Sequence, residues 1–312
     1  MASRKKPYSL LPEIPAGSRP RVLIVGNGIN LSFNGARGTD SIIKDEWKVY
    51  HYDELPDRPT EGDGDETHAF WKLPFPMQVV VASEDHVQSC MSKLAEYYQR
   101  TDIDLRQVNF IKEVVNCNFD AILTTNYSLE FERSTIEGFS KGKVYRQYRT
   151  SADQTAQQKQ FGLYQCTELP FANHPLLWHI HGTALRQNSM VMGQLFYGKL
   201  MSEVTSRANG VNAGYKDDLS FRPKSWVDYF LLGDIYIFGF DMAFSEIDIW
   251  WLLSYKKSSF PNTKVFYYSP TIAEEKTLVM NCYRIEMPEV EFDDEKQDYI
   301  DYYERIIKQV KK

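Results

Sequence analysis

Residues 21–30 read RVLIVGNGIN, a short apolar run that ends in glycine-rich turn residues. The run at 21–25 is typical of a strand buried on both faces, as the strands of parallel sheets are. Glycines directly after a strand let the backbone approach a ligand closely, and a helix N-terminus that follows them favours phosphate. This stretch therefore predicts a strand–turn–helix unit that binds a phosphate-bearing ligand. A tight turn without any ligand is the alternative.

The same succession of apolar strand, polar turn and helix recurs along the chain. Further strands are predicted at 119–126, 176–181, 234–239 and 263–268, with an edge strand at 283–287. Helices are predicted at about 84–100 and 104–117, from about 128, at about 245–257, from about 271 and at 294–312. The run at 77–82 fits either a strand or a buried turn of helix. The alternation indicates an α/β fold, with a parallel sheet covered by helices on both faces.

Two long stretches between the strands, 40–118 and 183–233, are interpreted as helical insertions that form a cap over one rim of the sheet. We assign them to a single domain at 21–312, which follows a proline-rich lead-in at 1–20. The stretch 52–66 is rich in Pro, Gly and carboxylates, which indicates a loop.

The composition argues against two classes of partner. The chain has 312 residues, and its 36 Lys and Arg against 42 Asp and Glu give a formal net charge of −6. A mildly acidic protein has no general attraction to a polyanion, so nucleic acid is not expected as a partner. No apolar run reaches the roughly 18 residues of a membrane-spanning helix, and the basic N-terminus lacks the apolar segment of a secretory signal. We expect a cytoplasmic protein with no membrane partner.

Aromatic residues are abundant, at 14% of the chain. Many of them lie on the predicted strands and helices of the sheet, including Trp178, Phe238 and Trp250. This placement favours packing in the core, or a face between protomers, over stacking on nucleic-acid bases.

The four cysteines Cys90, Cys117, Cys166 and Cys282 are scattered, and no two of them form a C-x-x-C pair. A zinc ribbon and a thioredoxin-type redox pair are therefore not expected. Four such thiols are typical of reduced core residues in a cytosolic protein.

Four predicted strands end in polar or glycine residues, at 26–30, 124–126, 181–182 and 239–241. If the sheet is parallel, all four ends lie on the same rim, where ligands bind in open α/β sheets. A lone asparagine such as Asn126 is more often a turn or cap residue than a catalytic one. His179 and His181 share one face of their strand. We interpret His179 as a core residue, and we expect His181, at the end of the strand, to reach the rim.

The segment after Gly239 contains a second pair of polar residues. Ser245 is predicted to cap the helix that follows, with Asp248 three residues later completing a variant of the capping box. On that interpretation Ser245 and Asp248 have only a structural role.

Taken together and in order, four motifs resemble the SIR2-like family, the sirtuin fold outside the deacetylases. They are VGNGINLSF at 25–33, ILTTNY at 122–127, IHG at 180–182 and GFDMAFSEIDIWWLL at 239–253. The resemblance implies a Rossmann-like (sirtuin/DHS-like) sheet that binds NAD. It places Asn126 and His181 at the nicotinamide ribose as the catalytic residues. The cofactor-binding residues that it implies are Gly26, Asn27, Gly28, Asn30, Thr125, Gly182, Gly239, Phe240 and Asp241.

The chain departs from the deacetylases of that family in two ways. It lacks the two C-x-x-C pairs that hold zinc in them, so the resemblance implies no zinc and weighs against protein deacetylation. Ser128 stands where the family usually has an aspartate after its T-x-N motif, which puts part of the hydrogen bonding near nicotinamide in doubt. Zinc-free relatives of this kind resemble bacterial antiphage effectors that degrade NAD. Such effectors are often homo-oligomers gated by a signal ligand or a regulatory protein.

The activity expected from this resemblance is that of an NAD glycohydrolase in antiphage defence. It would cleave the nicotinamide–ribose bond of its substrate NAD to nicotinamide and ADP-ribose, or a cyclic form. Asn126 would hold a water or a ribose hydroxyl, and His181 would accept a proton. An NAD or ADP-ribose sensor without chemistry and an ADP-ribosyltransferase stay open as alternatives. A nucleotide-binding oxidoreductase is less favoured, because Leu31 stands where the dehydrogenase fingerprint has Gly or Ala.

Overall fold

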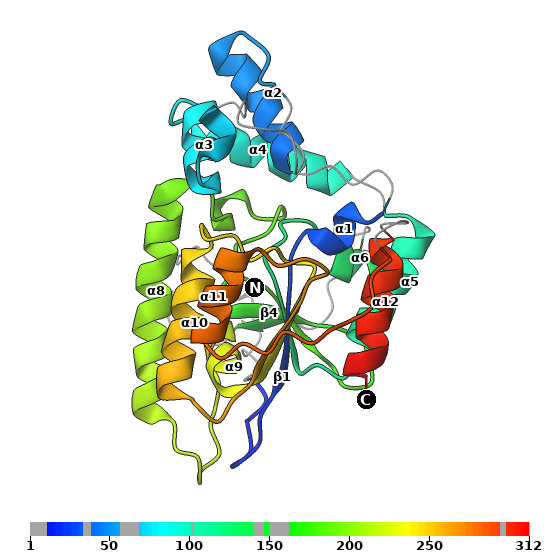
Figure 1. The fold of residues 1–312 in the computed structure, drawn as a ribbon, viewed down its shortest axis with the longest axis vertical. Coiled ribbons are helices and arrows are strands. Elements are labelled where there is room, and N and C mark those ends of the chain that lie inside the picture. The colour runs from blue at the N-terminus through cyan, green and yellow to red at the C-terminus, as the bar shows by residue number, and fades with distance from the viewer. Residues whose placement is uncertain are drawn as a thin grey trace, which may run out of the picture.

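A seven-stranded sheet forms the centre of the computed structural model, with helices on both sides of it (Figure 1). The structure describes residues 11–33, 39–56, 69–100, 103–139, 147–149, 162–293 and 298–311. The sheet has the strand order β3-β4-β5-β2-β1-β6-β7. Its strands are β1 (Arg21–Val25), β2 (Ala121–Thr124), β3 (Gln147–Arg149), β4 (Gln165–Glu168), β5 (Leu176–His179), β6 (Asp234–Phe238) and β7 (Val265–Tyr268).

The strands β5, β2, β1, β6 and β7 are all parallel, as the alternating pattern predicted. The chain runs from β1 outward to β2 and β5, and then returns to the other side of β1 for β6 and β7. This is the strand order of a Rossmann-like sheet, and the order reverses between β1 and β6.

The register sets the ends of these strands level with one another. Val25 lies opposite Thr124 on one side and Phe238 on the other, and the row continues through His179 and Tyr268. The residues that follow these five therefore emerge on one rim of the sheet, which confirms the expectation from the sequence.

Two strands were missed by the sequence reasoning. The edge strands β3 and β4 run antiparallel to their neighbours. Their sequences, QYR and QCTE, have no apolar run to mark them, because a short edge strand is defined mainly by its partner. The predicted edge strand at 283–287 is wrong. Only Glu286 pairs there, as an isolated bridge to Phe266 beside the end of the sheet.

A helix is present at each predicted position, and the ambiguous run at 77–82 is also helical, but the helices at 39–51, 193–214 and 226–232 were not predicted individually. Thirteen helices lie within the described residues. They are α1 (Gly28–Leu31), α2 (Thr39–His51), η1 (Ala69–Lys72), α3 (Phe75–Ala82), α4 (Val87–Arg100), α5 (Leu105–Val115), α6 (Glu130–Thr135), η3 (Gln187–Ser189), α8 (Gly193–Gly214), α9 (Trp226–Leu232), α10 (Ile247–Ser259), α11 (Glu274–Cys282) and α12 (Tyr299–Val310). Most of the loop predicted at 52–66 and the first residues of the helix predicted at 294–312 lie outside the described residues.

Each face of the sheet has its own apolar layer. On one face, α5 and α12 pack on Leu23 and Ile122, and on the other, α8, α9 and α10 pack on Ile24 and Leu123. Three of these helices, α5, α8 and α9, come from the stretches interpreted as insertions, yet they cover the sheet faces. Among the described residues of these stretches, α2, α3 and α4 stand over the carboxyl ends of the strands (Figure 1).

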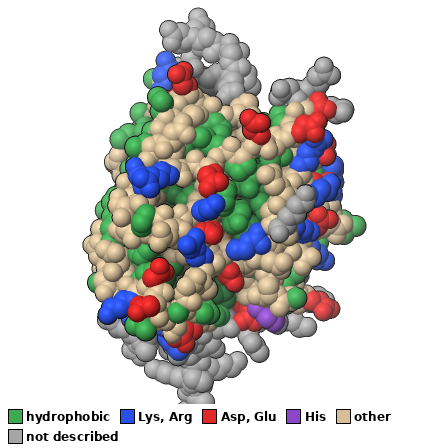
Figure 2. Space-filling model, turned by 60° about the horizontal axis from the view of Figure 1, so that its bottom comes forward, with side chains coloured by type: hydrophobic (Ala, Val, Ile, Leu, Met, Phe, Trp, Pro, Cys, Tyr) green, Lys and Arg blue, Asp and Glu red, His purple; other side chains and the backbone are tan. Residues whose placement is uncertain are grey.

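Many of the described aromatic side chains are buried in this core. Trp178 and Phe238 have no exposed surface, and Trp250 keeps 8%. Three of the four cysteines are also buried, but Cys282 is exposed on α11 and is not the core residue that was expected. Among the described residues, no helix combines the length and apolarity needed to cross a membrane. On the face shown in Figure 2, basic and acidic side chains are interspersed rather than gathered by sign.

A buried lysine ties the layer of α9 and α10 together. Lys256, on α10, is 2% exposed, and its Nζ donates hydrogen bonds to the carbonyls of Phe230, Leu231 and Gly233. These carbonyls lie at the C-terminal end of α9, where the helix leaves them without intrahelical partners. Burial lowers the pKa of Lys256 well below its ordinary value.

Replacing Lys256 with methionine should therefore destabilise the fold. The variant keeps most of the side-chain length but leaves three buried carbonyls without their donor, which we expect to lower the free energy of unfolding by about 1–3 kcal/mol. Urea denaturation followed by circular dichroism measures the change. Lys257→Met is the control, since Lys257 is the less buried neighbour on the same helix. Equal unfolding midpoints for the two variants would contradict this account.

Candidate functional site

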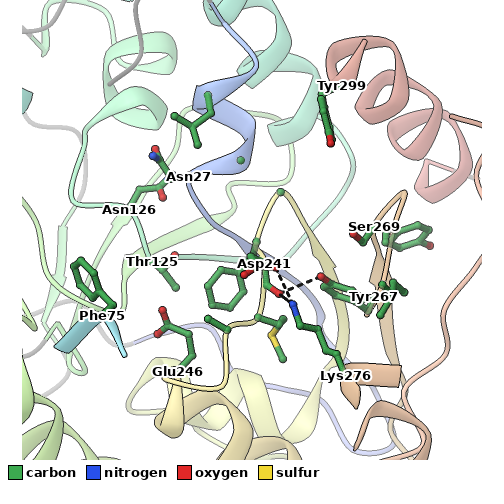
Figure 3. Close-up of a pocket in the computed structure, with 18 of the residues that line it drawn as sticks. Asn27, Phe75, Thr125, Asn126, Asp241, Glu246, Tyr267, Ser269, Lys276 and Tyr299 are labelled. Carbon is green, nitrogen blue, oxygen red and sulfur yellow. Dashed lines mark hydrogen bonds and ion pairs between the residues drawn. The ribbon is translucent and has the colours of Figure 1, made fainter. Parts of the chain in front are cut away.

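An open cleft of about 780 Å³ lies at the carboxyl ends of the parallel strands, where the strand order reverses (Figure 3). Its lining comes from the turns after β1, β2, β6 and β7, from His181 beyond β5, and from α3, α4, α8 and α12. Ligands of open α/β sheets bind at this position because the loops diverge on either side of the reversal.

The turns after β1 and β6 interlock at the base of the cleft. Gly28 N donates a hydrogen bond of 2.9 Å to Gly239 O. A Cβ on Gly28 would lie 2.8 Å from that oxygen, and one on Gly239 would lie 2.4 Å from Ile29 Cγ2. Gly239 also has a φ of +62°, a region that favours glycine. Packing between the turns thus requires both glycines.

Most of the residues predicted from the sequence meet in this cleft. They are Asn27, Gly28, Thr125, Asn126, His181, Gly239, Phe240 and Asp241.

Three predicted residues do not line the cleft. A Cβ on Gly26 would lie 2.7 Å from the ring of Phe240, so Gly26 is packed beneath that side chain. Asn30 is buried and accepts a hydrogen bond from Gln107 Nε2 at 2.9 Å. Gly182 has a φ of +89°, and a Cβ there would lie 2.0 Å from Ser189 O, so close packing alone requires this glycine. These three residues support the walls of the site rather than facing a ligand.

Asn126 is held in one orientation by its amide group. Its Nδ2 donates to Gly26 O at 3.1 Å and to Glu130 Oε1 at 2.7 Å. Both partners only accept hydrogen bonds, so they fix the amide nitrogen on their side and consume both of its hydrogens. The side-chain oxygen of Asn126, Oδ1, is thereby left to accept a hydrogen bond from a ligand hydroxyl or a water.

Glu130 supplies a carboxylate near the position where Ser128 replaces the expected aspartate. Ser128 Oγ donates to Glu130 Oε2 at 2.5 Å, and the other oxygen of Glu130 accepts from Asn126. Glu130 is 2% exposed. The sequence reasoning missed Glu130, whose only signal was a carboxylate four residues after Asn126, in the first turn of the next helix.

His179 lies beneath this arrangement, as the core interpretation proposed. Its Nδ1 is 2.8 Å from Asn126 O, and its Nε2 is 2.9 Å from Glu132 Oε1. Burial lowers the pKa of His179, but the charge and hydrogen bond of Glu132 outweigh that effect and raise it to about 9. His179 therefore buttresses the backbone of Asn126 as a buried ion pair.

His181 is held by a different carboxylate. Its Nε2 lies 3.0 Å from Asp248 Oδ2, and its Nδ1 lies 3.8 Å from Glu246 Oε2. The predicted capping box of Ser245 and Asp248 is wrong, because the residue that caps α10 is Glu246 and it makes no side-chain cap bond. Asp248 points inward instead and orients the imidazole of His181.

The protonation of His181 follows from these contacts. Burial lowers its pKa, but Asp248 and then Glu246 outweigh burial and raise the pKa to about 9. At neutral pH the side chain is therefore an imidazolium, which has no lone pair with which to accept a proton. The expected role of His181 as a base does not fit this state of the site.

Glu246 is the carboxylate of this group that lines the cleft, and the sequence reasoning missed it. Its side chain is 16% exposed, and Figure 3 shows its carboxylate directed into the cleft. Tyr197, on α8, donates to Glu246 Oε2 at 3.2 Å. Burial raises the pKa of Glu246, and His181 partly opposes that shift. The motif at 239–253 contains both Glu246 and Asp248. The capping interpretation gave Asp248 a structural role and left Glu246 without a role.

His181, Glu246 and Asp248 each place one potential metal-ligating atom within 4.8 Å of the others. The 3.0 Å contact between His181 Nε2 and Asp248 Oδ2 is the length of a hydrogen bond, so a proton occupies the space between these atoms. A cation on the cleft side would retain only Nδ1 of His181 and the carboxylate of Glu246 from this group.

The other end of the cleft combines aromatic rings with an ion pair. Tyr267 and Tyr268 line it, and Lys276 Nζ contacts Asp241 Oδ1 at 2.8 Å, as a dashed line in Figure 3 marks. The side chain of Asp241 is 82% exposed. A flat ring with a polar edge would find both kinds of contact here.

Comparison with known proteins adds nothing to this geometry. A scan against protein-family models and a search of curated proteins both gave no match.

Replacing Asp248 with asparagine should lower the pKa of His181 below about 9, because it removes the negative charge that most strongly favours the imidazolium. Because the pKa of His181 is raised from 6.5 to about 9 in the folded protein, its protonation also contributes to the free energy of unfolding. That contribution is fully present below pH 6.5 and is lost as the pH rises through about 9. NMR titration of the imidazole carbons in wild type and variant measures the shift. His179, paired with Glu132, is the internal control and should not move. An unchanged titration of His181 would show that Asp248 does not set its charge.

Proposed function

We propose that the protein is an NAD glycohydrolase with a SIR2-like (sirtuin/DHS-like) form of the Rossmann-like fold. It cleaves the bond between nicotinamide and ribose and releases nicotinamide and ADP-ribose, or a cyclic form of it. One observation carries the proposal. The cleft at the reversal of the strand order holds an oriented amide, Asn126, and a charged pair, His181 and Glu246, on its walls.

The shape of the cleft supports a dinucleotide as the substrate. Its volume of about 780 Å³ lies within the range of small-molecule sites, and its lining includes both the group around His181 and two tyrosines at the end of β7, Tyr267 and Tyr268. The turn after β1, at Asn27 and Gly28, also lines the cleft, and the start of the short helix α1 there would favour a pyrophosphate. The amide of Gly28 itself is already engaged by Gly239 O.

The charges in the cleft suit cleavage of a cationic substrate. When the C1′–N1 bond of NAD breaks, its electron pair neutralises the nicotinamide ring, so the leaving group needs little acid catalysis. The positive charge moves to the ribose, which becomes oxocarbenium-like. The carboxylate of Glu246, which lines the cleft beside His181, would stabilise that positive charge electrostatically. The carbonyl oxygen of Asn126 would accept from a ribose hydroxyl or the attacking water.

A sensor that binds NAD or ADP-ribose without chemistry is the second candidate. It is favoured by the protonated state of His181, which removes the base that the motif was expected to provide. ADP-ribosyl transfer to a protein is a branch of the first candidate, in which the acceptor replaces water.

A role in antiphage defence, a homo-oligomeric state and gating by a ligand or a regulatory protein complete the proposal. They rest on the resemblance of the four motifs and on the toxicity of unrestrained NAD cleavage to the cell that makes the enzyme.

The test of the activity is product analysis with NAD. Wild type should release nicotinamide, whereas Asn126→Ala and His181→Ala should release it at least about 100-fold more slowly, because each change removes an oriented group at the reacting ribose. Chromatography of the products separates ADP-ribose from a cyclic form, and labelled NAD reveals transfer to protein. Circular dichroism checks that the variants are folded. Saturable NAD binding without nicotinamide would favour the sensor, and wild-type rates in both variants would refute the assigned residues.

A further inference from the structure

We infer that Glu246 is the general base of the proposed hydrolysis, and that it takes the proton from the water that attacks C1′ of the nicotinamide ribose. The inference rests on the proposed function and adds a catalytic residue to it. It starts from the position of Glu246 within the group formed with His181 and Asp248.

The two carboxylates beside His181 have different access to the cleft. Asp248 has no exposed surface and lies behind the imidazole, in the first turn of α10, where negative charge is favoured. Its Oδ1 is buried and has no hydrogen-bond partner among the described residues, and its Oδ2 lies 3.0 Å from His181 Nε2. Glu246 lines the cleft, where Figure 3 shows its carboxylate, and its Oε2 lies 3.8 Å from Nδ1 of the imidazole. A water in the cleft can reach Glu246 but not Asp248.

His181 cannot take the proton itself in this arrangement. Its Nε2 is engaged by Asp248, and its Nδ1 faces Glu246 at 3.8 Å. With a carboxylate on each side, the imidazole retains its proton at neutral pH, since its pKa is raised to about 9. Its function is to position Glu246 and to hold the charge of the group, which makes it a positioning residue in this step.

The surroundings of Glu246 suit a base that works near neutral pH. The titratable groups that face it are His181, Asp248, Tyr197, Tyr127 and Asp241. Burial raises the pKa of Glu246 above its ordinary value, and a base is most effective when its pKa approaches the working pH. Tyr197 donates its hydroxyl hydrogen to one carboxylate oxygen and so fixes the orientation of the group.

The step balances without a further reactant. The C1′–N1 bond breaks, and its electron pair goes to the ring nitrogen of nicotinamide, which leaves as a neutral molecule. The water oxygen forms a bond to C1′, and one water proton passes to the carboxylate of Glu246 and from there to solvent. The other product is ADP-ribose.

The first experiment compares Glu246→Gln with wild type by release of nicotinamide from NAD. Glutamine has the same shape and can still accept from Tyr197, but it is not a base, so the rate should fall at least about 100-fold. Binding of NAD, measured by calorimetry, should be retained. Glu289→Gln, which removes an exposed carboxylate that does not line the cleft, is the matched control and should keep the wild-type rate. A wild-type rate in Glu246→Gln would overturn the inference while leaving the proposed function intact. If wild type itself releases no nicotinamide, the proposed function fails and this inference with it.

The second experiment separates a base from a residue that only holds the site together. Azide is an anionic nucleophile that needs no base, and Glu246→Ala leaves space for it. Added azide should therefore raise nicotinamide release by folded Glu246→Ala at least about 10-fold, with ADP-ribosyl azide as the product detected by mass spectrometry. Absence of both the acceleration and the adduct would show that Glu246 acts only as an ion-pair partner of His181.

The third experiment uses pH and metal ions. The rate of nicotinamide release by wild type should rise with pH as Glu246 loses its proton. The residual rate of Glu246→Gln should not show this rise with pH. A chelator should leave the wild-type rate unchanged. Loss of activity with the chelator and recovery with an added divalent cation would overturn the inference, because His181 and Glu246 would then act as metal ligands.

Discussion

The hydrogen bond from Gly28 N to Gly239 O joins the two turns at which the strand order reverses, and the rest of the site depends on this junction. It connects segments that are far apart in the chain and packs them too closely for a Cβ on either glycine. Because the register sets the strand ends level, the turns after β2 and β5 arrive on the same rim. A cleft of fixed shape therefore exists before any ligand arrives, and its polar groups need only be oriented.

Buried carboxylates provide that orientation. Glu130 holds the amide of Asn126, and Asp248 holds the imidazole of His181, each from a position with little or no exposure to solvent. Burying a charge is unfavourable unless it is paired, and such pairs contribute little to stability for that reason. Their effect here is to hold each cleft-lining group in one orientation and one protonation state, which is what a reaction that depends on electrostatic stabilisation requires.

Sequence reasoning predicted the five parallel strands, because each is a short apolar run followed by turn residues. It missed β3 and β4, which are polar, short and recognisable only by the strands they pair with. It also placed most of the cleft residues correctly on one rim. It mistook Asp248 for part of a helix cap, because its spacing from Ser245 fits that motif equally well. The spacing of Ser245 and Asp248 along the chain gives no information about His181, whose imidazole reaches Asp248 from the end of β5.

The order of apolar and polar residues along the chain was enough to set the layers, the parallel sheet and the rim at which Asn126 and His181 lie, because burial of apolar surface is a property of each segment. The protonation of His181 and the exposure of Glu246 were decided only by the folded structure. Both depend on distances among His181 after β5, Tyr197 on α8, and Glu246 and Asp248 at the start of α10. Electrostatic interaction is set by distance and burial rather than by position in the sequence.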